Sequence, residues 1–221
     1  MNFDLLSRAL PTLLEATGDT LTMVGLAMLV TIVLGLPLGI VVATTGKGGV
    51  LQCRPLNWLL GFIINIGRSM PFIILMVALI PFTRFLVGGS LGVKGAVVPL
   101  SAAAIPFFAR LVEIAVREVP NGLIEAARSL GGGSLSVCVK VLLPEALPAI
   151  VLGLTTTIVS LISYSAMAGT IGAGGLGDVA LRYGYQQYKL EYMFSTLVII
   201  VIIVQIIQMV GSWLANRLSH R

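Results

Sequence analysis

Charged side chains are scarce in this chain. Lys, Arg, Asp and Glu together account for 10% of its 221 residues, whereas a soluble domain carries about 25% because its surface must be hydrated. Apolar residues make up 57%, and the mean hydropathy is +1.03. The composition therefore argues against a soluble globular protein and predicts that lipid surrounds most of the chain.

The residues of most catalytic and metal sites are also rare. A single histidine, His220, cannot build a Ser–His–acid site or a histidine metal cluster. Cys53 and Cys138 lack CxxC spacing, and we expect both on the reducing side of the membrane, without a disulfide or a metal. No phosphate-binding G-x-x-x-x-G-K-[ST] loop occurs. We expect no catalytic residue, no bound cofactor and no nucleic-acid binding.

Long apolar runs dominate the sequence. A bilayer core about 30 Å thick needs about 20 apolar residues of helix, and only helices or closed barrels satisfy their backbone groups in lipid. The sequence predicts an all-α polytopic membrane protein with one transmembrane domain, residues 20–216, followed by a short tail, 217–221. About five spans are expected, at residues 21–42, 56–82, 96–116, 150–171 and 193–214.

Residues 1–19 precede the first span. Their leucines favour an amphipathic helix on the membrane surface, and a disordered tail is the alternative. Acidic residues before a long apolar run argue against a cleavable signal peptide.

The positive charges indicate the orientation, because Lys and Arg are enriched in cytoplasmic loops. With the N-terminus outside and the C-terminus inside, eight cationic residues face the cytoplasm and five face outward. The inner set is Lys47, Arg54, Arg110, Arg117, Arg128, Lys140, Arg217 and Arg221, and the outer set is Arg8, Arg84, Lys94, Arg182 and Lys189.

Arg68 lies within the second predicted span, where a charge is costly unless it is paired or hydrated. One interpretation places it beside a polar path, near a helix break at Pro71. The other ends a surface segment at Gly67 and begins a shorter span at Ser69, with Arg68 at the interface.

Hydroxyl side chains are concentrated in the fourth span. Ser160, Ser163, Tyr164 and Ser165 are candidates to line a translocation path. Close helix packing is the alternative role for any one of them.

Gly172–Gly177 matches the dinucleotide fingerprint G-x-G-x-x-G. That motif requires a preceding strand and a βαβ unit, whereas membrane helices flank it here. We interpret these glycines as a tight turn.

A short helix is predicted in the loop 117–147, between the third and fourth spans. Asn121 is suited to cap its start, and Gly131 to end it with a positive φ. Leu123, Ile124, Ala127 and Leu130 fall on one face at helical spacing. That face is expected to pack on the bundle, on lipid headgroups or in a groove on a partner.

This loop carries a family resemblance. Glu125, Ala126, Ala127 and Gly131, followed by Val141, Leu143 and Pro144, are similar to the E-A-A-x3-G-x9-I-x-L-P signature of ATP-binding-cassette (ABC) importer permeases, with valine in place of isoleucine. The resemblance implies the type I ABC importer permease fold and a cytoplasmic coupling helix that docks on a separate ATPase. ATP and Mg would then be bound by that partner.

Residues 161–186 more narrowly resemble the methionine-uptake permeases, through Ser163–Gly169 and Arg182–Gln186. The resemblance implies import of methionine, the L and also the D form, across a bacterial cytoplasmic membrane. It also implies a second copy of this chain, two ATPase subunits and an external substrate-binding lipoprotein. The alternatives are a permease for another small amino acid or related solute, a passive channel and a membrane-embedded enzyme. A channel needs no coupling helix, and an enzyme would need acidic or histidine clusters within the spans.

Overall fold

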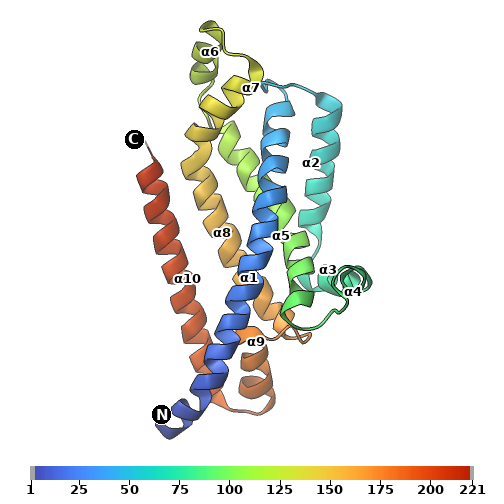
Figure 1. Cartoon of the computed structure of the whole chain (residues 1–221), viewed down its shortest axis with the longest axis vertical. Coiled ribbons are helices and arrows are strands. Elements are labelled where there is room, and N and C mark those ends of the chain that lie inside the picture. Colours follow the sequence, from blue (N-terminus) through green and yellow to red (C-terminus); the bar gives the residue numbers. More distant parts are fainter. Residues whose placement is uncertain (1–2, 220–221) are drawn as a thin grey trace.

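The computed structural model describes residues 3–219, and for residues 3–8 the backbone alone. All elements in this described part are helical. Five long helices run along the bundle (Figure 1): α1 (Phe3–Thr45), α2 (Arg54–Ser69), α5 (Gly92–Arg117), α8 (Leu143–Gly169) and α10 (Leu190–Leu218). The all-α architecture is confirmed.

Short elements close the two ends of the bundle. The end that holds the start of α1 also contains α3 (Phe72–Ala78), α4 (Ile80–Val87), α9 (Gly175–Val179) and the π-helix η2 (Ala180–Gln186). The opposite end contains α6 (Asn121–Ser129), α7 (Ser134–Val137) and the π-helix η1 (Cys138–Leu142), and α10 also ends there (Figure 1).

Helix α1 is longer than the first predicted span. It continues without a break through the segment 1–19, as far as that segment is described. Ala9, Leu13 and Ala16 are buried against Leu176 and Val179 of α9. The apolar stripe of this segment therefore packs on protein along one face, and its location at the membrane surface stays a prediction.

The second predicted span is not one straight helix. Between α2 and α3 the chain bends by 101° at Met70–Pro71. Pro71 has no N–H to donate and disfavours helical geometry in the residue before it. Because α3 has only seven residues, no straight span starts at Ser69, and that part of the second interpretation is wrong. The position of Arg68 relative to the interface stays a prediction.

The fourth span begins earlier than predicted. Helical structure resumes at Ser134 and runs through η1 into α8, so the second half of the predicted loop is helix. At η1 the N–H of Leu143 donates to the carbonyl of Cys138, five residues back. Pro144 follows with no N–H, and the wider π turn accommodates that missing donor.

Close backbone contact joins α1 to α5. A Cβ on Gly39 would lie 2.5 Å from the Ala109 carbonyl oxygen, and one on Gly35 would lie 3.2 Å from that of Ile105. Glycines four residues apart let two membrane helices approach closely. Four described helices are long and apolar enough to cross a membrane, and the bent pair α2–α3 makes a fifth candidate. This number agrees with the five predicted spans.

Candidate coupling helix and pathway residues

Helix α6 has sharp ends. Pro120 occupies the N-cap position, and Asn121 is the first helical residue. The expected Asn121 cap is therefore wrong, since no side chain caps this end. At the other end Gly131 has φ +82°, and its N–H donates to the Arg128 carbonyl while that of Gly132 donates to Ala127. This Schellman pattern satisfies the last carbonyls and gives Gly131 the positive φ that was predicted.

The apolar face of α6 is only partly covered. Ile124 and Ala127 are half-buried against a core cluster whose residues come from α1, α5, α7, η1 and α8. Leu123 and Leu130, 42% and 90% exposed, point away from it together with Ala126. Two residues of the predicted apolar stripe therefore attach α6 to the bundle, and the rest of its apolar surface is uncovered.

The remaining signature residues lie around this helix. Glu125 is exposed on α6. Leu143 is half-buried against the same core cluster, and Pro144 is exposed beside it at the start of α8. The signature thus combines an exposed helix, α6, with the first residues of the membrane helix α8.

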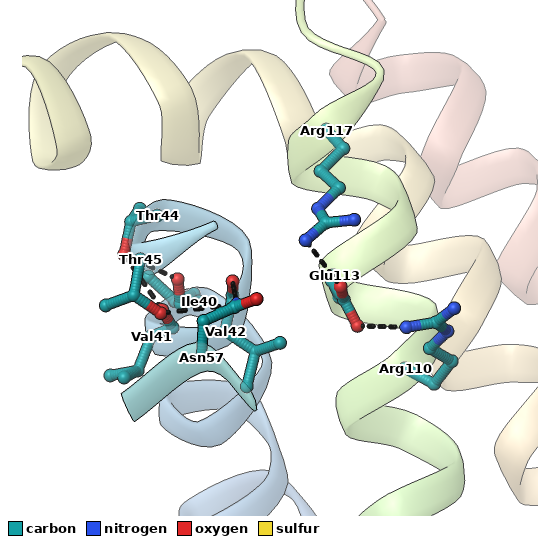
Figure 2. A network of polar contacts seen from close by, with 9 residues as sticks. All are labelled: Ile40, Val41, Val42, Thr44, Thr45, Asn57, Arg110, Glu113 and Arg117. Atoms are coloured by element: carbon teal, nitrogen blue, oxygen red, sulfur yellow. Dashed lines mark hydrogen bonds and ion pairs between the residues drawn. The ribbon is translucent and has the colours of Figure 1, made fainter. Parts of the chain in front are cut away.

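A buried carboxylate lies at this end of the bundle. The sequence did not lead us to expect it. The Glu113 side chain on α5 is 3% exposed; one of its oxygens lies 2.7 Å from Arg110 and the other 3.0 Å from Arg117 (Figure 2). The i, i+3 and i, i+4 spacing in Arg110–Glu113–Arg117 was the available signal. This network leaves one net positive charge at the last turns of α5, where cations are favoured by the helix dipole.

The first turn of α2 is joined to the end of α1 by a polar contact. The Asn57 side-chain amide donates to the Val42 carbonyl at 2.7 Å (Figure 2). This bond joins α1 to α2, whereas both ion pairs of Glu113 lie within α5.

The hydroxyl groups of α8 bond back to their own helix. Ser160 donates to the Thr156 carbonyl at 3.0 Å, and Ser163 to that of Val159 at 3.4 Å. Ser163 is exposed and Ser160 is partly exposed on the protomer. Ser165 is buried and donates to Ile162, which places it in the packed interior, off that surface.

Tyr164 connects α8 to the broken span. Its ring stacks on Phe72 of α3, with centroids 4.7 Å apart. Arg68 lies one turn before that break, exposed at the last turn of α2. The stacked rings thus bring the start of α3, four residues after Arg68, to the part of α8 that carries Ser163.

Comparison with known proteins identifies the family. Residues 35–221 match the family described as binding-protein-dependent transport system inner membrane component. The chain belongs to this family. The chain is a transport permease, and the ATPase of such a transporter is a separate subunit.

Relatives of this permease cover nearly its full length. The chain is 54% identical over 209 residues to the probable D-methionine transport system permease protein MetI of Vibrio cholerae, covering 95% of this chain and 93% of that protein. It is 45% identical to the methionine import system permease protein MetP of Bacillus subtilis, covering 80% of each.

A solved structure shares the whole fold of this permease. The MetNI methionine ABC transporter in an inward-facing conformation matches with a TM-score of 0.94 and 41% identity, over 100% of both chains. The predicted type I ABC importer permease fold is confirmed.

Proposed function

We propose that this permease carries methionine across the cytoplasmic membrane, driven by ATP hydrolysis on a partner. The 54% identity to a probable D-methionine permease over nearly the whole chain carries the substrate assignment. The exposed surface of α6 supports the coupling role: Ala126 lets a partner approach the helix backbone, and Leu123 and Leu130 offer apolar contacts.

The proposed assembly contains two copies of the permease, two ATPases with bound ATP and Mg, and an external substrate-binding lipoprotein. Twofold symmetry of the ATPases favours a symmetric permease pair. ATP binding would close the ATPases and, through Glu125, Ala126, Ala127, Gly131, Leu143 and Pro144, tilt the bundles between outward and inward access.

The proposed path runs along α8 and the break between α2 and α3. Arg68, Ser160, Ser163 and Tyr164 supply polar groups there, since their side chains are at least partly exposed on the protomer. Ser165 is buried in α8 and would stabilise the helix that lines the path.

Uptake of radiolabelled methionine into proteoliposomes tests the function. Vesicles containing the permease, its ATPase and the binding protein should accumulate methionine only when ATP is present on the ATPase side. A hydrolysis-deficient ATPase is the control. Equal uptake of unrelated amino acids would overturn the methionine assignment, and uptake without ATP would overturn the ABC mechanism.

The proposed orientation is N-terminus outside and C-terminus inside, with α6 in the cytoplasm. Cys53 is exposed at the α6 end, so an impermeant maleimide should label it only after the cells are opened. Gln187, exposed between η2 and α10 at the other end, should label in intact cells as Gln187→Cys in a Cys53→Ser background. The reverse pattern would refute this orientation.

A further inference from the structure

A polar cavity of about 440 Å³ lies between the α1–α2 turn, the end of α5 and the inner side of α6. Lys47 and Arg117 both line it, and no carboxylate does. Lys47 is exposed and forms no ion pair within residues 9–219. The cavity wall therefore carries uncompensated positive charge.

Arg117 is held in place at this wall. Its guanidinium group is 3.0 Å from Glu113, and a Cβ on Gly46 would lie only 2.7 Å from its Nη2 atom. Glycine at position 46 thus lets the guanidinium lie directly against the α1–α2 turn. One ion pair uses a small part of the five N–H donors of an arginine, and half of the side chain is exposed.

The position of the cavity at the helix ends indicates that it lies near the lipid headgroups. It opens where α1 ends and α2 begins, and Trp58 is 70% exposed at the start of the second turn of α2. Tryptophan is enriched at this level of a membrane. Leu59, Phe62 and Ile63 continue an exposed apolar surface along α2, on which acyl chains can lie while a headgroup occupies the cavity.

We propose that this cavity binds the phosphoryl headgroup of an anionic phospholipid, contacted by Lys47 and Arg117. Basic pockets at helix ends are suited to such headgroups. Ile124 and Asn121 of α6 form part of the same wall, so the lipid would support the coupling helix from its inner side. The proposal goes beyond the transport function and requires only that the bundle spans a membrane.

Native mass spectrometry of the permease–ATPase complex tests this site. Complexes purified from vesicles of phosphatidylcholine with phosphatidylglycerol should retain phosphatidylglycerol selectively. Lys47→Gln should bind it about fivefold more weakly, the factor that corresponds to about 1 kcal/mol for one cation near the membrane surface. The matched control is Lys140→Gln, which removes an exposed charge at the same end of the bundle but outside the cavity.

Equal lipid retention in the wild type and Lys47→Gln would overturn the site, as would equal losses in both variants. A titration with inorganic phosphate in detergent separates the sources: Lys47-dependent binding of phosphate without selectivity for phosphatidylglycerol would assign the site to a free anion and overturn the lipid. Methionine uptake is measured on the same preparations. Failed uptake by the wild type would count against the proposed function and leave the lipid result intact.

Discussion

Two glycine-rich segments lie at opposite ends of the bundle and differ in what surrounds them (Figure 1). A Cβ on Gly131 or Gly133 would meet nothing within 4 Å. By contrast, one on Gly177 would collide with the Ala166 backbone, and one on Gly169 with Asp178. At the α6 end Gly131 and Gly133 provide backbone geometry and leave the surface open, and between them Gly132 is crowded by the Ala127 carbonyl of the helix that it ends. At the α9 end Gly169 and Gly177 permit close packing of α8 on α9.

The close packing at the α9 end explains why Gly172–Gly177 matches a nucleotide-binding motif but serves as a turn. Gly172, Gly174 and Gly175 all have positive φ and reverse the chain between α8 and α9, which confirms the predicted tight turn. The Leu176 N–H donates a hydrogen bond to the Thr20 hydroxyl of α1 at 2.9 Å. A backbone amide that a nucleotide-binding loop would offer to phosphate is thus used inside the fold.

The largest effect on stability is expected for Gly177→Ala. The new methyl group meets backbone atoms of Ala166, which cannot move aside as a flexible side chain would. We expect a loss of about 3 kcal/mol in the free energy of unfolding, seen as a lower unfolding temperature of the purified permease. Gly133→Ala is the control, with φ −67° and open space around it, and should change stability by less than about 0.5 kcal/mol. Equal tolerance of both variants would refute the contrast between the two segments.

Ala126→Trp tests whether the open end is a docking surface. Ala126 is exposed on α6, so the bulky ring should hold the ATPase away without disturbing the bundle. We expect co-purification of the ATPase to weaken about tenfold, the effect of about 1.4 kcal/mol, at an unchanged unfolding temperature.

Ala78→Trp provides the matched control for docking, because Ala78 is exposed on α3 at the other end. It should leave ATPase binding unchanged. Normal ATPase binding by Ala126→Trp would mean that this face of α6 is not the coupling surface.

A smaller effect is expected for Gly131→Ala, because only backbone strain opposes it. The positive φ should cost about 1 kcal/mol, measured as faster amide hydrogen exchange across residues 121–130. Gly122→Ala, within α6 and also in open space, should instead slow the exchange, since alanine favours a helix by about 0.8–1 kcal/mol over glycine. If both substitutions shift exchange in the same direction, the φ of Gly131 does not control this end of α6.

The sequence alone was enough to predict that lipid surrounds most of the chain, where the spans approximately lie and where the coupling helix is. These depend on properties that are local in the chain: the length of the apolar runs, the paucity of charge and the spacing from Glu125 to Pro144. The break at Pro71 was also visible locally, because proline removes a donor wherever it occurs.

Only the tertiary structure decided which glycines are crowded, which side of α6 is free and which residues surround the cavity at Lys47. Gly133 and Gly177 both lie in glycine-rich segments, but only Gly177 packs against the backbone of α8. Likewise Ile124 and Leu123 are neighbours of similar hydrophobicity, and of the α6 side chains only Ile124 and Ala127 pack on the core cluster that includes α7 and η1. Such differences arise from contacts between segments far apart in the chain, and the hydrophobic periodicity of one helix does not specify them.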